Sequence, residues 1–407
     1  MMKSGKIEGK RHGIIIVAIV LVTLLLFSAC GPATAPADKE KVVPIGWLVG
    51  LTGPAATAGQ YPHMVLKDYI TYINEEEAIP GVTIDLLWMD TKNEVPYEIS
   101  GYRKFVDNDV PIIISMCESE IFKKWLEKDE VPMLTMVLTE AAIYPPGWIY
   151  SAYPTWAEEF AVWCEWILGN WEEDRPPRIA RMGPDILVGP HALEPAVPYV
   201  ENIGVEMLPT EYVPYVPLDI STQLLRLRER GTDYVYISPI WTIAVPTLRD
   251  AQRLGLLGKV KFGGSENTQS EGLIKAAGDA AEGYIAPRAI PWWKETEVPG
   301  IKLMTDLRTK YGGRFDFQGD DVHAIVFGAI AVEAIKRAIE DVGYENLDGK
   351  AVKNALDSMK DFDVYGLKKI TYTPDDHRGN TQVRIYQVKN GIPTPVSAWQ
   401  EAPMIVP

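Results

Sequence analysis

Short apolar runs alternate with longer amphipathic stretches along most of the chain. The apolar runs predict β-strands over residues 42–49, 82–89, 111–116, 132–138, 178–182, 234–238, 259–262 and 284–287. Between these runs, apolar residues recur at helical spacing, which predicts helices over residues 63–75, 155–171, 222–230, 244–254, 322–341 and 350–358. Apolar strands that alternate with helices are typical of parallel sheets covered on both faces. The pattern therefore predicts an α/β fold with doubly wound sheets.

The last forty or so residues have a different pattern. Three short strand-like runs cover residues 370–373, 382–388 and 394–399, and turn-forming residues separate them. Asn390-Gly391 lies between the last two runs, and this dipeptide favours a tight hairpin. We therefore expect a small antiparallel appendage at the end of the α/β body.

The first forty residues carry the pattern of an export signal. Four basic residues, among them Lys10 and Arg11, precede an apolar run over residues 14–27 that is too short to span a bilayer comfortably. The string Leu-Phe-Ser-Ala-Cys-Gly at 26–31 resembles a bacterial lipoprotein box, with Phe27 where that box usually has leucine. It predicts a signal peptide over 1–29, a lipidated Cys30 and an extended Pro/Ala-rich tether over 30–40. The alternative is an ordinary signal peptide with a chance cysteine.

Composition narrows the function classes. The chain has 407 residues, a length typical of two or three domains, and a net charge of −15, from 40 basic and 55 acidic residues. Such an acidic surface would repel nucleic acid. Five histidines and three cysteines are too few to suggest a zinc framework or a disulfide scaffold, so we expect no metal and no cofactor. Cys117 and Cys164 are predicted to be buried free thiols, although two thiols in an exported chain could pair.

Three sequence motifs, taken in their order along the chain, resemble those of a known family. They are Ile-Gly-Trp-Leu-Val-Gly-Leu-Thr-Gly-Pro-Ala at 45–55, Met-Asp-Thr at 89–91, and Phe-Gly-Gly-Ser-Glu at 262–266 followed by Ala-Gly-Asp-Ala-Ala-Glu-Gly at 277–283. In this order they resemble the type I extracytoplasmic solute-binding proteins of ABC importers, in the branch of the leucine/isoleucine/valine-binding proteins. The resemblance covers residues 42–399.

The resemblance implies two lobes joined by three crossovers, with a ligand cleft between them. Lobe 1 would comprise residues 41–153 and 287–361, and lobe 2 residues 154–286 and 362–407. The cleft would hold a small polar ligand (an amino acid, an amide or a related compound) and deliver it to a membrane permease with its ATPase. We expect a monomer held by lipid at the outer face of the cell membrane.

The resemblance also implies ligand contacts. Thr139 matches the hydroxyl that holds a ligand carboxylate, at a strand end where backbone N–H groups such as that of Val137 are free. Glu266 matches an acid that takes the ligand's amino group, and Trp241 matches an aromatic cover. Each has a structural alternative: a helix N-cap for Thr139, a solvated loop acid for Glu266 and core packing for Trp241.

The end of the third strand departs from the family pattern. Cys117-Glu118-Ser119 stands where the family has serines. An ionised Glu118 would repel a ligand carboxylate and favour an amide, a urea-like donor, a polyol or a cationic amine. If Ser119 faces the cleft instead, an amino acid ligand remains open. Ala58 and Val188 replace larger side chains of the family, so we expect a roomier pocket.

Two other functions are alternatives to import. The common nucleotide-binding, zinc-protease and serine-hydrolase motifs do not occur in the sequence, so we do not expect an enzyme. A ligand sensor that docks on a receptor would use the same two lobes, and the sequence does not distinguish it from an importer component. A dense group of tryptophans is predicted to pack in the core rather than form a lid: Trp148, Trp156, Trp163, Trp166 and Trp171.

Overall fold

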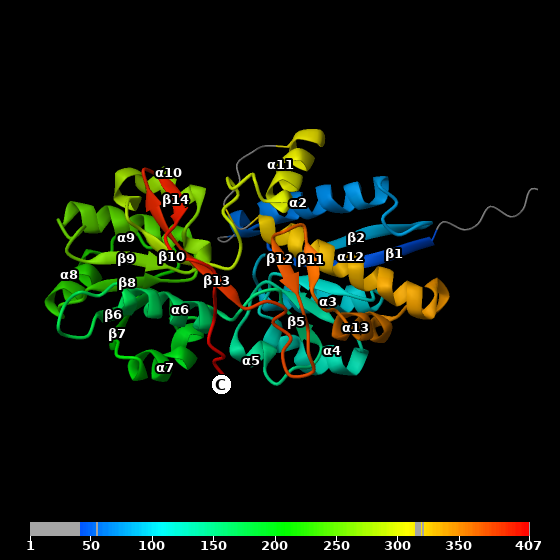
Figure 1. Cartoon of the computed structure of the whole chain (residues 1–407), viewed down its shortest axis with the longest axis horizontal. Coiled ribbons are helices and arrows are strands. Elements are labelled where there is room, and N and C mark those ends of the chain that lie inside the picture. The colour runs from blue at the N-terminus through cyan, green and yellow to red at the C-terminus, as the bar shows by residue number, and fades with distance from the viewer. Residues whose placement is uncertain (1–40, 54–55, 314–318, 320, 407) are drawn as a thin grey trace, which may run out of the picture. The chain divides into compact units, whose positions relative to one another are not determined.

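The computed structural model describes residues 41–53, 56–313, 319 and 321–406, and shows two lobes that each contain one main sheet (Figure 1). The predicted signal peptide, Cys30 and the whole predicted tether lie outside the described residues. Among those described, no helix combines the length and apolarity needed to cross a bilayer.

The first lobe has a five-stranded sheet in the order β2-β1-β3-β4-β5. Its strands are β1 (Lys41–Val49), β2 (Val82–Asp90), β3 (Ile113–Ser115), β4 (Met133–Thr135) and β5 (Ile149–Tyr150). Its helices are α2 (Ala56–Glu75), α3 (Val95–Val106), η1 (Ser119–Phe122), α4 (Lys123–Asp129), α5 (Glu140–Ile143), α11 (Pro299–Lys310), α12 (Val322–Val342), η5 (Tyr344–Asn346) and α13 (Gly349–Asp357). The pairings β1–β3, β3–β4 and β4–β5 are parallel, as predicted.

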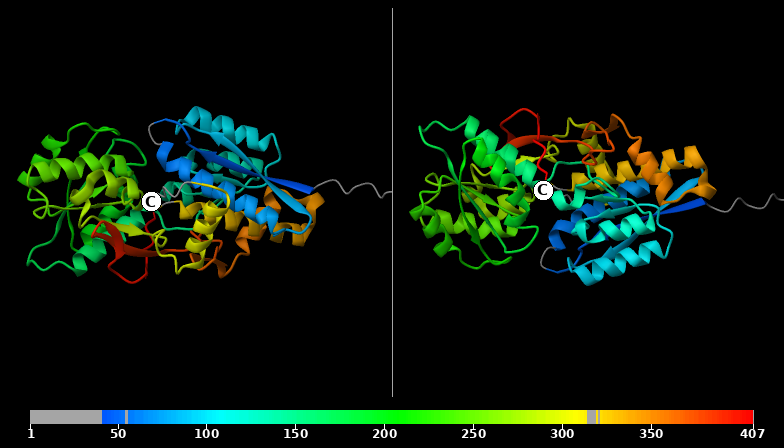
Figure 2. Two further views of the ribbon diagram at one scale, coloured as in Figure 1. Left: turned by 90° about the horizontal axis from the view of Figure 1, so that it is seen from above. Right: turned by 90° about the horizontal axis from the view of Figure 1, so that it is seen from below.

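Alternation along β1 explains why helices cover both faces of this sheet. Trp47 and Val49 point into the core under α2 and α12, whereas Leu48 points into the core under α3 and α4. All three side chains are fully buried, because successive residues of a strand face opposite sides and each side is covered. The views in Figure 2 show helices on both sides of these strands.

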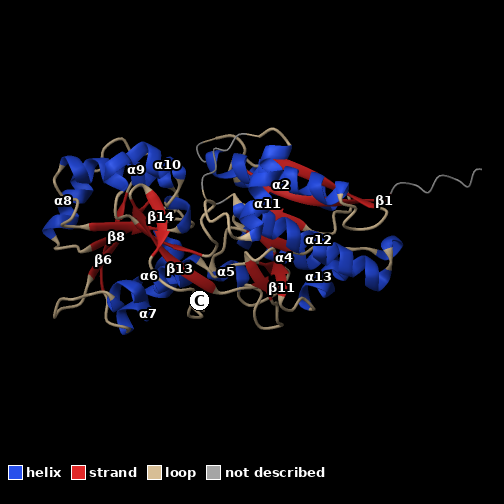
Figure 3. Ribbon diagram, turned by 45° about the horizontal axis from the view of Figure 1, so that its top comes forward, coloured by secondary structure: helices blue, strands red, loops and turns tan. Residues whose placement is uncertain are grey.

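The second lobe has a larger sheet, in the order β14-β13-β10-β9-β8-β6-β7 with β15 beside β13. Its strands are β6 (Arg178–Gly183), β7 (Glu206–Tyr212), β8 (Tyr234–Ile237), β9 (Lys261–Gly264), β10 (Ile285–Arg288), β13 (Gln382–Lys389), β14 (Ile392–Pro395) and β15 (Gln400–Glu401). Its helices are α6 (Trp156–Gly169), η2 (Pro190–Ala196), α7 (Val197–Asn202), α8 (Ser221–Glu229), α9 (Trp241–Arg253), η3 (Glu266–Thr268), α10 (Glu271–Ala277) and η4 (Gly278–Ala281). Figure 3 shows the strands of both lobes between their helices.

The C-terminal appendage is confirmed and is part of the second sheet. Strand β13 runs antiparallel to β10 and to β14. The predicted turn at Asn390-Gly391 joins β13 to β14, and Lys389 pairs with Ile392 across it. Both turn residues have positive φ, which asparagine and glycine tolerate best.

The chain crosses between the lobes after β5, after β10 and before β13. The predicted third boundary, between 361 and 362, differs from the packing. Strands β11 (Phe362–Val364) and β12 (Lys368–Ile370) pair only with each other in the described sheets, and Val364 and Ile370 are buried in the core of the first lobe together with Tyr372. This packing favours a third crossover after Tyr372, and the precise domain division stays a prediction.

Cys117 and Cys164 are separate buried thiols, as predicted. Cys117 follows β3 in the first lobe and Cys164 lies in α6 of the second.

Candidate ligand-binding site

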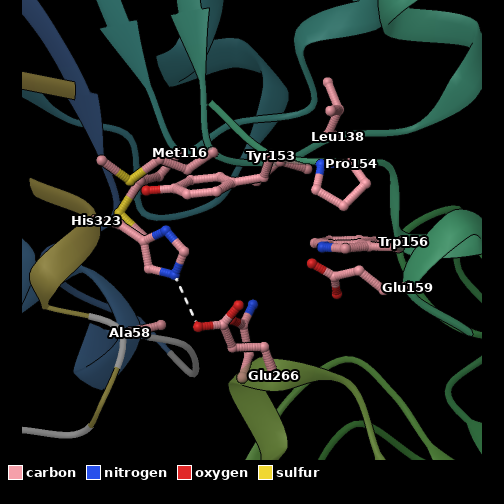
Figure 4. Close-up of a pocket in the computed structure, with 12 residues that line it drawn as sticks. Ala58, Met116, Leu138, Tyr153, Pro154, Trp156, Glu159, Glu266 and His323 are labelled. Carbon is pink, nitrogen blue, oxygen red and sulfur yellow. Dashed lines mark hydrogen bonds and ion pairs between the residues drawn. The ribbon is translucent and has the colours of Figure 1, made fainter. Parts of the chain in front are cut away.

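Two adjoining cavities are lined by residues of both lobes. Their volumes are about 60 Å³ and about 200 Å³, the size of a small molecule rather than a macromolecule. We call them the inner and the outer cavity; Figure 4 shows the inner one. They share five lining residues, so they form one continuous cleft: Ala58, Met116, Val137, Trp156 and Asn267.

The cleft lies where the parallel strands end. Met116 follows β3, Val137 follows β4 and Asn267 lies shortly after β9. Ligand sites of open α/β sheets lie beyond the carboxyl ends of their strands, since the loops there leave the sheet and expose backbone groups. The strand ends of both lobes therefore contribute to one site.

Glu266 begins η3 directly beyond β9 and lines the inner cavity. It is only 4% exposed, so it is not a solvated loop acid. Its carboxylate forms an ion pair with Arg288 at 2.9 Å, contacts His323 Nε2 at 3.2 Å and accepts a hydrogen bond from the Ala289 N–H at 3.1 Å. Burial alone would raise the pKa of Glu266, but Arg288, His323 and this N–H together hold the pKa below its ordinary value. Glu266 is therefore ionised and already paired.

Arg288 is a site residue that sequence reasoning missed. It is the last residue of β10 and is fully buried. Besides Glu266, its guanidinium donates to the carbonyl oxygens of Gly319 and Gln269, and it lies 5.0 Å from the centre of the Trp292 ring. The available signal was an arginine inside the apolar run Ile-Ala-Pro-Arg-Ala-Ile at 285–290, since arginine is rarely buried without a partner.

The contact between Glu266 and His323 joins the two lobes. His323 lies on α12, which packs in the core of the first lobe, whereas Glu266 follows a strand of the second sheet. Tyr153 packs edge-on against the His323 ring, with ring centres 4.4 Å apart. Figure 4 shows His323 and Glu266 meeting on one side of the inner cavity.

Glu159 is the second site residue that was missed. It lies in the first turn of α6, is 4% exposed and lines the inner cavity. Its Oε2 has no hydrogen-bond partner among the described residues. Burial raises the pKa of Glu159 well above its ordinary value, and the neighbouring Glu266 carboxylate raises it further. The neutral acid is therefore more populated at Glu159 than for an ordinary glutamate.

The adjacent Glu158 has the opposite surroundings. Its carboxylate accepts hydrogen bonds from Arg378 at 2.7 Å and from the N–H groups of Thr155 at 2.8 Å and Ile405 at 3.0 Å. Glu158 and Thr155 form the capping box that begins α6. Of two successive glutamates, one anchors the helix and the other is left to face the cavity.

The outer cavity has its own carboxyl groups. Glu98 of α3 is 4% exposed, and its Oε2 has no hydrogen-bond partner within the described part of the chain. Burial raises the pKa of Glu98 to about 7. Glu118 precedes η1 and is partly buried, and burial followed by the Glu120 charge raises its pKa. Asn93, Asn267 and Tyr215 add further polar groups to this lining.

The structure brings some of the predicted ligand contacts together and not others. Glu266, Glu118 and Val137 line the cleft, as do Ala58 and Val188. Ser119 points elsewhere: its hydroxyl donates to Thr135 Oγ1 at 2.5 Å and to the carbonyl of Cys117 at 3.1 Å. The structure thus places Glu118, and not Ser119, in the lining. Ligand contact by any of these residues stays a prediction.

Thr139 caps a helix and Trp241 packs against the core, which are the structural roles given above as alternatives to ligand contact. The Thr139 hydroxyl accepts a hydrogen bond from the Ala142 N–H at 3.3 Å and caps α5. Trp241 begins α9 and packs against the core of the second lobe. Neither residue is in the described lining of the two cavities. Among the tryptophan group, Trp163 is fully buried in the core, whereas Trp156 lines both cavities.

Comparison with known proteins agrees with this architecture. A family model described as periplasmic binding protein matches residues 42–392. The chain belongs to this family of periplasmic binding proteins. The family and fold are those of exported binding proteins rather than enzymes.

Individual relatives are distant. The Leu/Ile/Val-binding protein of Escherichia coli (strain K12) is 22% identical over 277 residues, which are 67% of this chain and 72% of that protein. A branched-chain amino acid ABC transporter structure from Thermus thermophilus with bound valine has a TM-score of 0.83 at 24% identity, covering 89% of this chain and 97% of that one. A fatty acid ABC transporter substrate-binding protein from Thermomonospora curvata has a TM-score of 0.80 at 19% identity, covering 92% and 97%. These structures confirm the type I binding-protein fold, and their different ligands show that the fold alone does not fix the ligand.

Proposed function

We propose that this protein is the extracytoplasmic solute-binding component of an ABC importer. It captures a small polar ligand between its lobes and delivers it to a membrane permease with an associated ATPase. The observation that carries the proposal is the continuous cleft lined by buried polar groups of both lobes. The family match and the structural similarity to ABC transporter proteins support it.

Ligand capture would work through lobe closure. A ligand shifts the population toward a closed form only if it binds that form more tightly, which requires contacts to both lobes. Trp156 and Glu266 from one lobe and His323 and Tyr153 from the other line the same inner cavity. A ligand there touches both lobes, and the permease can then distinguish the loaded form from the empty one.

We further propose that the mature chain begins at a diacylated Cys30 and stays at the outer face of the cell membrane as a monomer. Two acyl chains anchor a protein stably, whereas one anchors it weakly. The prolines and alanines of residues 31–40 would keep the domain away from the lipid. Replacement of Cys30 by alanine should release the protein into the soluble fraction, and an unchanged membrane fraction would refute the anchor.

Native mass spectrometry tests the binding role and identifies the ligand in the same experiment. The protein is purified from its own host, its mass is measured in the folded and denatured states, and the released compound is identified. We expect one small molecule per chain, recovered chemically unchanged after rebinding, and uptake of that compound by cells only when the protein and its permease are both present. Conversion of the compound by the protein, or uptake that does not depend on the protein, would contradict the proposal.

A further inference from the structure

The lining of the cleft is rich in carboxyl groups and poor in cations. Four glutamates line the two cavities: Glu98, Glu118, Glu159 and Glu266. Among the described lining residues there is no lysine or arginine. Glu266 is neutralised by Arg288, which lies behind it. Within the described part of the chain, the remaining carboxyl groups are not paired with a cation at hydrogen-bond distance.

Among these carboxyl groups, Glu159 is the strongest candidate for direct contact with a ligand. It is 4% exposed and its Oε2 is unpartnered among the described residues. A buried polar atom without a hydrogen-bond partner destabilises the folded protein, so such atoms are rare unless a ligand or water supplies the partner. Figure 4 shows the Glu159 carboxylate beside the Trp156 ring, facing the space toward Glu266. An ammonium placed there would meet a carboxylate and an aromatic face, the two groups that bind organic cations best.

The other charged groups near Glu159 are already engaged. The charges of four neighbours affect the pKa of Glu159: Glu266, Lys368, Arg288 and Glu158. Arg288 pairs with Glu266, and Arg378 pairs with Glu158. The Lys368 ammonium donates to Asn380 Oδ1 and to the carbonyl of Gln382, both at 2.8 Å. None of these cations is hydrogen-bonded to Glu159 in the described contacts.

The far end of the cleft repeats the arrangement. Glu98 is equally buried, with an unpartnered Oε2, and Glu118 lies in the same outer cavity. Between the two acidic ends the shared lining is mostly apolar, with Met116, Val137 and Trp156. The apolar middle section is chemically suited to methylene groups, and each acidic end is suited to a hydrogen-bond donor.

We propose that the ligand is an organic dication of the diamine type, with one ammonium bound by Glu159 in the inner cavity and the other by Glu98 and Glu118 in the outer cavity. This inference rests on the proposed binding function and specifies its ligand class. A ligand carboxylate would face acidic groups at either end, so the amino acids bound by some relatives bind poorly here.

Calorimetric titration of the mature protein with matched compounds tests the ligand class. The probes are the diamines putrescine and cadaverine, the monoamines butylamine and pentylamine, and the amino acids leucine, isoleucine and valine. We expect at least one diamine to bind roughly tenfold or more tightly than its monoamine, because the second ammonium gains a charged hydrogen bond. Tighter binding of any of the three amino acids than of every amine, or no binding of any amine, overturns the inference. If the compound found by mass spectrometry is an amino acid, the import proposal stands and the dication inference fails.

Two substitutions test which glutamate binds each ammonium group of the diamine. Glu159→Gln should weaken diamine binding by about tenfold or more, and Glu98→Gln should lower diamine affinity toward the monoamine level. Glu165→Gln is the matched control on α6, because Glu165 hydrogen-bonds Tyr199 and does not line either cavity. Near-ultraviolet circular dichroism verifies that each variant is folded. Unchanged amine affinity in both Glu159→Gln and Glu98→Gln overturns the assignment.

Proton release on ligand binding distinguishes a direct ligand contact of Glu159 from a purely structural role. Because the pKa of free Glu159 is raised, a cation bound there favours the ionised carboxylate and promotes proton release, whereas a neutral ligand does not. Titrations with the best diamine at about pH 7.5, in buffers of different ionisation enthalpy, should show proton release that is reduced in Glu159→Gln. Equal proton release in the wild type and in Glu159→Gln contradicts the placement of the ammonium at Glu159.

Discussion

Glu266 and Arg288 form a buried ion pair, and we expect the loss of either charge to destabilise the folded protein strongly. Replacing Arg288 by methionine leaves an ionised Glu266 buried without its main partner, which typically costs about 3–5 kcal/mol in free energy of unfolding. Urea denaturation measures the loss. The control is Arg253→Ala, which breaks an exposed pair with Asp250 and should cost far less. The double variant with Glu266→Gln should recover part of the stability. An Arg288→Met protein as stable as the control would contradict the pairing.

The raised pKa of Glu159 predicts that the free energy of unfolding changes with pH in the opposite direction from that expected for an ion-paired acid. Its pKa is raised in the folded state, so the unfolded chain loses the proton first and stability falls as pH rises above the pKa of an ordinary glutamate. Glu159→Gln removes this penalty. Without ligand, the variant should therefore gain free energy of unfolding relative to the wild type as pH rises from about 5 to about 8. Urea denaturation at both pH values checks this, and a difference between the proteins that does not change with pH would count against a raised pKa.

The sequence pointed to some site residues and not to others for a physical reason. Glu266 stands in a family-like motif at a strand end, and Glu118 follows a predicted strand where the family has serines, so their places could be predicted. Glu159 follows another glutamate in a helix start, where acids are common because they favour the N-terminal end of the helix dipole. Only the packing shows that Glu158 is saturated by Arg378 and that Glu159 faces the cleft.

Among the elements, helix α6 connects fold stability to the site. Its N-cap Thr155 accepts from the Glu158 N–H and fixes the first turn, which carries both Trp156 and Glu159. Thr155→Ala should cost about 1 kcal/mol in unfolding free energy and should also weaken ligand binding, because that turn loosens. Ser270→Ala removes the N-cap of α10, should cost a similar amount and should leave binding unchanged. Equal ligand affinity in both variants, measured by calorimetry, would show that the cap does not position Glu159.

Most elements could be predicted because periodicity reports burial directly. Strand β8 is buried on both faces and was an unbroken apolar run. Strand β7 was missed because it lies at the sheet edge and is largely polar, with exposed Glu206 and a proline inside it. The pairing of β11 with β12 was also missed, since two three-residue strands carry too little pattern to be distinguished from loops.

For the molecule as a whole, the sequence predicted two lobes and a cleft but could not predict what the cleft contains. Its inner polar groups come from α6, η3 and α12, segments far apart in the chain that meet only after both lobes fold. Spacing along a sequence carries no information on such a meeting. The fold class came from local patterns, whereas the chemistry of the site depends on long-range packing.

Ligand capture between the lobes is tested most sharply by a crystal structure of the protein purified from its own host, with the cleft left empty until refinement is complete. We expect residual density for one small molecule between Trp156 and Glu159 on one lobe and His323 on the other, in contact with both lobes. Density for a bound molecule elsewhere, with ordered water alone in both cavities, would contradict capture in this cleft.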